Sequence, residues 1–209
     1  MHFGIFIYDG VEPIDLGTYG VLSMARRVAP QIRISTVAAK AGTVRFANEL
    51  DVIARHGMAD APAFDALIVT GGPGWEAQCT HTPTLDYLRR CVNQQMLVAA
   101  VCTGGMILAA SGVLDGRIAT TKQEVIAGRE VPPLARLHDE YPRVDARPAL
   151  LADSGLVVTG GGVTLCIDVT LYLLERLLGA EVASETARIM EYGAARAANH
   201  TRLPTLKSA

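Results

Sequence analysis

Runs of consecutive apolar residues that end in glycine or another turn residue recur along the chain. A strand with one face in water alternates between apolar and polar positions, whereas these runs are apolar almost throughout. Such runs are typical of strands covered by helices on both faces. They predict strands at FGIFIY (3–8), IRISTVA (32–38), ALIVTGG (66–72), MLVAAVC (96–102), RIATT (117–121) and GLVVTGG (155–161).

Segments with helical spacing of apolar residues lie between these runs. Pro13 suits a first helical turn, and Gly179 is placed as a C-terminal stop. The alternation predicts an α/β fold with a mainly parallel sheet, and the stretch 149–158 adds a hairpin. The predicted helices cover residues 14–28, 83–95, 104–112, 164–179 and about 184–196, and the polar, proline-broken tail from about 196 to 209 is expected to lack regular structure.

Composition narrows the class of protein. A chain of 209 residues suits one domain, expected to span 1–209 with its core at about 2–195. No apolar run approaches the roughly 18 to 20 residues of a membrane helix, and the opening MHFGIFIYDG lacks the features of a signal peptide. The net charge is -2, and the charged residues form no long runs of one sign. We therefore expect a cytoplasmic protein with a small-molecule substrate and neither nucleic-acid nor membrane partners.

Three glycine-rich bends follow predicted strands, at GGPGW (71–75), TGG (103–105) and GGG (160–162). Ligands of open α/β sheets bind outside the carboxyl ends of the strands, so these bends predict a site at that edge. Neither a GxxxxGK[ST] nor a GxGxxG motif follows a strand, and the cysteines are too widely spaced for a metal knuckle. We therefore expect neither a metal nor an organic cofactor.

Cys102 stands out within AAVCTGGMILAASG (99–112) because it ends a strand and precedes a helix. This is the context of a nucleophile elbow, in which a helix N-terminus lowers the pKa of a thiol. Thr103 N–H, with a second N–H from Gly71 or Gly72, would then bind a developing oxyanion. The alternative is a buried structural thiol, the interpretation we give to the remaining cysteines, Cys79, Cys91 and Cys166.

Several of these stretches together carry a family resemblance. EPIDL (12–16), ALIVTGGPG (66–74), the elbow around Cys102 and TGGGVTLCIDVTLYLLERLLG (159–179) resemble the DJ-1/PfpI (ThiJ/PfpI) superfamily. The resemblance implies the class I glutamine amidotransferase-like, flavodoxin-like fold, with a nucleophile elbow and usually a homodimer. Within the superfamily, the chain is most similar to isonitrile hydratases and to the N-terminal domains of AraC-type regulators.

The resemblance also suggests roles for acidic and basic residues. Asp15 stands where relatives place a carboxyl group beside the thiol, although it could instead complement the helix dipole. Glu12 is a weaker candidate. Lys122 stands where many relatives carry a histidine after a Thr-Thr pair, so it is either a site cation or an ordinary exposed lysine. The five histidines lie in no partner motif and are expected at the surface or in loops.

Other residues receive structural interpretations. Asp168 matches a family segment, and we expect it to hold the start of its helix to a loop. Trp75 and Tyr19 either line a pocket or pack in the core.

Three functions remain open at this point. The first is isonitrile hydration to an N-substituted formamide through a thioimidate on Cys102. The second is glyoxalase-like, deglycase-like or stress-linked hydrolase activity. The third, of another class, is redox sensing or ligand binding without turnover.

Overall fold

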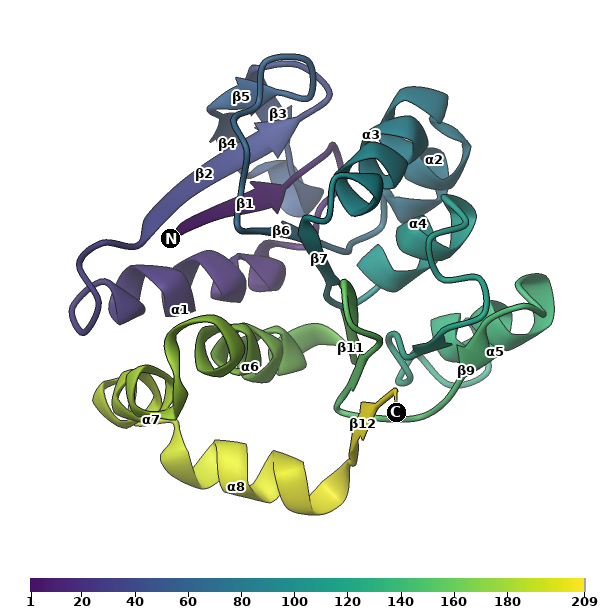
Figure 1. Ribbon diagram of the computed structural model, residues 1–209. Coiled ribbons are helices and arrows are strands. Elements are labelled where there is room, and N and C mark those ends of the chain that lie inside the picture. The colour runs from purple at the N-terminus through teal and green to yellow at the C-terminus, as the bar shows by residue number, and fades with distance from the viewer. Residues whose placement is uncertain (209) are drawn as a thin grey trace.

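The computed structural model describes residues 1–208 and is built around an eight-stranded sheet (Figure 1). Its strand order is β12-β10-β11-β7-β6-β1-β2-β5, and every neighbouring pair is parallel except β10 with β11. The strands are β1 (His2–Phe6), β2 (Arg33–Ala38), β5 (His56–Gly57), β6 (Ala66–Val69), β7 (Leu97–Ala100), β10 (Leu151–Asp153), β11 (Val157–Gly160) and β12 (Thr205–Lys207).

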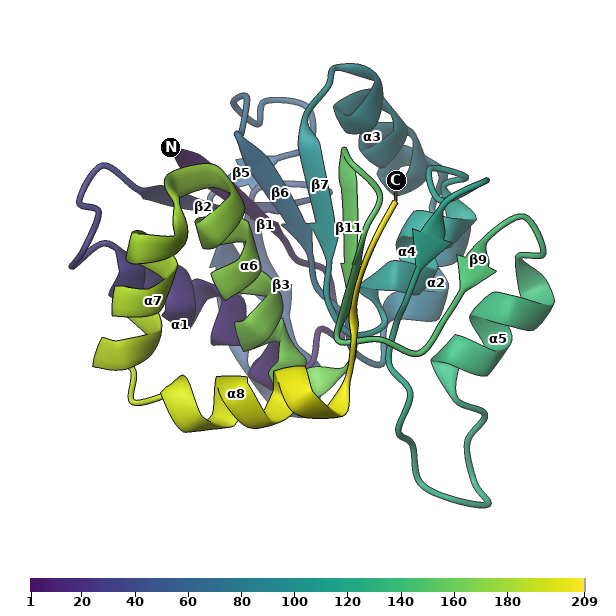
Figure 2. The same cartoon turned by 60° about the horizontal axis from the view of Figure 1, so that its bottom comes forward.

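Helices cover both faces of this sheet. Figures 1 and 2 show α1 (Gly17–Ala25), α6 (Cys166–Leu178) and α7 (Ala180–Ile189) on one side. The other side carries α2 (Trp75–Thr80), α3 (Thr82–Asn93) and α4 (Gly104–Ala110), with α5 (Pro133–Glu140) beside α4. The predicted α/β architecture is therefore confirmed. Strands β1, β6 and β7 are buried at every position, as their continuous apolar runs predict.

The predicted hairpin and first helix are present with local differences. Strands β10 and β11 pair antiparallel, and Pro13 begins a 3-10 helix, η1 (Pro13–Leu16), that leads into α1. The predicted strand 117–121 is wrong in its placement. Only β8 (Ile118–Ala119) forms there, and it pairs with β9 (Asp145–Ala146) outside the main sheet.

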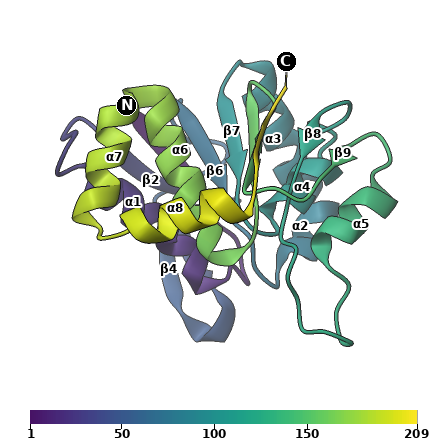
Figure 3. The same cartoon turned by 90° about the horizontal axis from the view of Figure 1, so that it is seen from below.

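The prediction for the C-terminal part of the chain is also wrong in two respects. The helix expected at 184–196 is two helices, α7 and α8 (Gly193–Arg202), and the tail expected to be irregular contains β12. Residue 209 of that tail lies outside the described residues. A hairpin of β3 (Gly42–Arg45) and β4 (Asp51–Ala54), joined by η2 (Ala47–Glu49), was not predicted and projects from the body in Figure 3.

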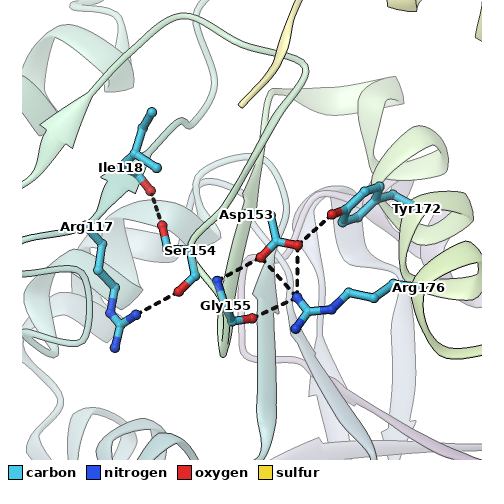
Figure 4. Close-up of polar contacts among 7 residues, drawn as sticks. All are labelled: Arg117, Ile118, Asp153, Ser154, Gly155, Tyr172 and Arg176. Atoms are coloured by element: carbon cyan, nitrogen blue, oxygen red, sulfur yellow. Dashed lines mark hydrogen bonds and ion pairs between the residues drawn. The ribbon is translucent and has the colours of Figure 1, made fainter. Parts of the chain in front are cut away.

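Polar contacts fix the β10–β11 turn on two sides (Figure 4). The Asp153 carboxylate accepts hydrogen bonds from Tyr172 Oη at 2.5 Å and Arg176 Nη1 at 3.0 Å, both on α6. On the other side, Ser154 Oγ donates to Ile118 O at 2.7 Å, and Arg117 Nη1 donates to Ser154 O at 2.8 Å. These bonds hold α6 and the start of β8 against the turn that precedes β11, and β11 leads to the third glycine bend.

No helix within residues 1–208 combines the length and apolar character needed to cross a membrane.

Candidate functional site

Cys102 lies on a sharp turn between β7 and α4. Its φ is +53°, in the left-handed region that non-glycine residues rarely adopt. The next turn of chain passes so close to β6 that a Cβ atom on Gly104 would lie 2.4 Å from Val69 O. The strand-to-helix elbow predicted from the small residues around Cys102 is therefore present, and its bend presents the thiol at the end of the sheet.

All three glycine bends meet at this thiol. A Cβ atom on Gly71 would lie 2.9 Å from Cys102 Cβ and 2.5 Å from Thr103 N, so the first bend touches the elbow directly. Cys102 N donates to Gly161 O of the third bend at 3.2 Å. Thr121 Oγ1 donates to Cys102 O at 2.7 Å. The strained turn is thus held from several elements at once.

Asp15 is bound to the Gly71 bend, which also touches Cys102. The side chain is fully buried, and Oδ2 accepts a 2.6 Å hydrogen bond from Gly71 N. Its Oδ1 is buried without a hydrogen-bond partner among the described residues. Burial raises the pKa of Asp15 to about 7, against the opposing effect of the Gly71 bond, and the Glu12 charge adds to the rise. Near neutral pH this carboxyl group can accept or release a proton.

The Cys102 thiol is protonated at rest, contrary to the predicted low pKa. Burial first, and the Asp15 charge second, raise the pKa of Cys102 to about 12. The N–H groups of Thr103 and Val163 and the charge of Lys122 lower the pKa, but by less. The helix N-terminus therefore acts in the predicted direction, and desolvation outweighs it. A nucleophilic Cys102 needs a base to take its proton.

The expected second oxyanion donor is not at Gly71 or Gly72. Gly71 N–H is bound to Asp15, and Gly72 N–H donates to Thr103 Oγ1 at 2.9 Å. The N–H groups that point at the sulfur belong to Thr103, as predicted, and to Val163 in η3 (Val163–Leu165). Val163 is β-branched and has a φ of +50°, so its N–H is held by a strained backbone. Its only signal in the sequence is its place after the GGG bend.

Cys102 and Thr103 open onto a cavity of about 940 Å³. Trp75 lines this cavity, whereas Tyr19 does not and is 43% exposed. Asp15 is not among the lining residues. The lining residues are Glu12, Ile14, Gly72, Pro73, Trp75, Glu76, Cys102, Thr103, Lys122, Val125, Glu130, Val131, Pro133, Arg136 and Val163.

Lys122 brings a positive charge to the thiol end of this cavity. Its side chain packs against Gly162, and its charge lowers the pKa of Cys102. No histidine lines the cavity. His2 corrects the expectation of surface histidines, because it is buried in β1 and its Nε2 lies 2.9 Å from Ser35 Oγ.

The remaining cysteines and Asp168 lie in structural positions. Cys91 and Cys166 are buried in α3 and α6, and Cys79 is partly buried in α2. Asp168 Oδ2 accepts hydrogen bonds from Tyr192 Oη at 2.8 Å and Asn199 Nδ2 at 2.9 Å. Asp168 thus ties the start of α6 to Tyr192 in the α7–α8 connection, as expected, and also to Asn199 of α8. Within residues 1–208, no group of three or more His, Cys, Asp or Glu side chains is placed to hold a metal ion.

Comparisons with known proteins give matches over most of the chain. The model of the DJ-1/PfpI family matches residues 3–176. The isonitrile hydratase of Pseudomonas putida is 29% identical over 198 residues, which cover 93% of this chain and 80% of that protein. The HTH-type transcriptional regulator GbdR of Pseudomonas aeruginosa is 28% identical over 96% of this chain, which spans only 53% of the regulator. A ThiJ/PfpI family protein from Pseudomonas syringae superposes with a TM-score of 0.78 at 21% identity, covering 92% of this chain and 75% of that one.

Proposed function

The chain belongs to the DJ-1/PfpI family, and on that premise we propose that it is a cysteine-dependent isonitrile hydratase. The observation that carries this proposal is a protonated thiol, Cys102, that opens onto a large cavity and is backed by a buried carboxyl group of near-neutral pKa. Similarity to the Pseudomonas putida isonitrile hydratase over 93% of the chain supports the choice of reaction.

In the first step, Cys102 sulfur attacks the terminal carbon of the isonitrile. The ionised form of Asp15, which is well populated near pH 7, takes the thiol proton as the carbon–sulfur bond forms. The negative charge that develops on the reacting centre is stabilised by the N–H groups of Thr103 and Val163 and by Lys122. Asp15 then returns the proton to the same carbon, which gives a thioimidate, R–N=CH–S–Cys102.

In the second step, water adds to the thioimidate carbon. Asp15 accepts a proton from this water and delivers it to the nitrogen, so that the carbon becomes tetrahedral. The carbon–sulfur bond then breaks, its electron pair returns to sulfur, and the hydroxyl proton regenerates the thiol. The products are the free enzyme and an N-substituted formamide, and the net change is the addition of one water to the isonitrile.

Turnover of cyclohexyl isonitrile by freshly reduced protein tests the proposal, with N-cyclohexylformamide measured by chromatography. We expect formamide production by the wild type and none by Cys102→Ser. The matched control is Cys91→Ser, which removes a buried thiol of α3 that does not line the cavity and should leave turnover intact. Absence of formamide from the reduced wild type would contradict the assignment. Methylglyoxal consumption that is lost in Cys102→Ser would favour the glyoxalase-like alternative instead.

The homodimer and the cytoplasmic location expected from the sequence stay predictions. Sedimentation of the purified protein tests the dimer, and fractionation of cells that express the chain tests the location.

A further inference from the structure

We infer that the cavity selects isonitriles with a large, uncharged, apolar substituent, and that Val131, on the loop between β8 and α5, is a specificity-determining residue. This inference rests on the proposed function, because it names the substrate class of the same site. Figures 2 and 3 show that the loop projects beyond the sheet at the side of α5. Val125, Glu130 and Val131 of this loop line the cavity.

The two ends of the cavity have different chemistry. The polar groups that act on a reacting atom, the N–H groups of Thr103 and Val163 and the amine of Lys122, gather at the sulfur. The rest of the wall presents mostly apolar surface, from Ile14, Trp75, Val125, Val131 and Pro133 among others. An isonitrile carbon and nitrogen fill little of a cavity of about 940 Å³. That volume lies near the top of the roughly 300–1,000 Å³ range of pockets that bury drug-sized ligands, so the space is available to the substituent.

Two apolar side chains of this wall are exposed to solvent over much of their surface. Ile14 of η1 is 46% exposed, and Val131 is 63% exposed, although both line the cavity. A hydrocarbon substituent would remove water from both surfaces at once, which favours its binding. Ile126 lies on the same loop and is 57% exposed, but it does not line the cavity. The loop therefore supplies both a candidate residue and a matched control.

The charges around the cavity disfavour an anionic substituent. Arg136 is occupied, because it donates to Glu76 at 2.5 Å and Glu140 at 2.7 Å while stacking on Trp75 at 4.6 Å. Two further carboxylates of the wall, Glu12 and Glu130, form no ion pair among residues 1–208. Among the described residues that line the cavity, the basic side chains are Lys122, which acts on the thiol, and Arg136, which is paired. A carboxylate at the end of the substituent would therefore meet repulsion without a partner.

The rate at which alkylating probes label Cys102 measures this substituent preference independently of isonitrile turnover. The probes are N-methyl-iodoacetamide, N-hexyl-iodoacetamide and 6-(iodoacetamido)hexanoate, with labelling of Cys102 followed by peptide mass spectrometry and normalised to glutathione. A buried methylene is worth about a fourfold gain. We expect N-hexyl-iodoacetamide to label Cys102 at least about tenfold faster than the methyl probe, and the hexanoate at least about tenfold slower than the hexyl probe.

Substitutions in the loop then locate the selectivity. Val131→Asp should lower the hexyl-to-methyl ratio by about tenfold, because it replaces apolar wall with a charge. Ile126→Asp makes the same change outside the cavity and should leave the ratio unchanged. Equal labelling by the three probes, or equal effects of the two substitutions, would overturn the inference. If selective labelling is found and isonitriles are not turned over, the pocket preference stands and the proposed function fails.

Discussion

Asp15 and Asp168 are both buried acidic side chains, and each has one oxygen, Oδ1, without a hydrogen-bond partner among the described residues. Burial raises the pKa of both carboxyl groups. They differ in what surrounds the other oxygen. Asp15 Oδ2 has a single backbone donor, Gly71 N, beside a thiol and a cavity. Asp168 Oδ2 has two side-chain donors, Tyr192 Oη and Asn199 Nδ2, between two helices.

This difference separates a group that exchanges protons from one that holds helices together. With one backbone donor, the pKa of Asp15 stays at about 7, and the Cys102 thiol is a group from which Asp15 can accept a proton. The two donors to Asp168 offset part of the burial effect on its pKa and fix the carboxylate in place. Burial and a raised pKa therefore do not identify a catalytic carboxyl group until its neighbours are known.

The largest expected effect is on activity. Asp15→Asn removes the base that takes the Cys102 proton, so kcat/KM for cyclohexyl isonitrile should fall by roughly 10²- to 10⁴-fold. Asp168→Asn is the matched substitution and should change kcat/KM by less than about threefold, provided that both variants are folded by circular dichroism. Equal losses in the two variants would show that the distinction is wrong.

The next effect is on stability and its pH dependence. Since the pKa of Asp15 is raised in the fold, this group costs no stability below about pH 4, where both states are protonated. The cost builds up between about pH 4 and pH 7, where only the unfolded state ionises, and is complete above about pH 7. Relative to wild type, Asp15→Asn should therefore gain up to about 4 kcal/mol in unfolding free energy from low pH to pH 8. Urea denaturation across this range measures the gain, and a difference independent of pH would contradict it.

A tenfold effect is expected in the pH profile. Because Asp15 must be ionised to accept the thiol proton, kcat/KM should fall about tenfold per pH unit below about pH 7 and level off above it. Asp168→Asn should keep this profile. A flat wild-type profile between pH 5 and pH 8 would exclude Asp15 as the base.

The smallest expected effect is the change in the free energy of unfolding when the Tyr192–Asp168 hydrogen bond is removed. Tyr192→Phe removes one donor to Asp168 and should lower the free energy of unfolding by about 1 kcal/mol, with kcat/KM unchanged. Tyr19→Phe is the control, because Tyr19 is 43% exposed and lies outside the cavity. Equal stability of the two variants in urea would argue against a role for the Tyr192 bond.

The sequence predicted the parts of the fold that depend on local apolar pattern. The runs at 66–72 and 96–102 contain the buried strands β6 and β7, and small residues around Cys102 allowed the elbow to be foreseen. By contrast, α8 has no buried side chain and therefore no apolar stripe. Strand β12 exists through its pairing with β10, which is distant in sequence, so no local signal marks it.

The sequence identified most residues of the site, but it did not predict where their N–H groups point or that the pKa of the thiol is raised. Cys102, Thr103, Asp15 and Lys122 were identified, and the last three lie close enough to the Cys102 thiol to shift its pKa. The N–H groups of Gly71 and Gly72 point to other partners, and the donor found in their stead is Val163. Peptide orientation in a bend and the desolvation of a thiol depend on elements that meet only in the folded chain.

The attachment of α8 has a consequence for local unfolding. With no buried side chain, this helix is held by polar contacts, including Asn199 to Asp168 and Arg196 to Glu175 at 2.9 Å. Amide hydrogen exchange should therefore detect α8 opening as a separate unit, before the helices packed on the sheet. Opening would expose the Asp168 carboxyl group to water, where it ionises more easily, so α8 should open more readily as the pH rises.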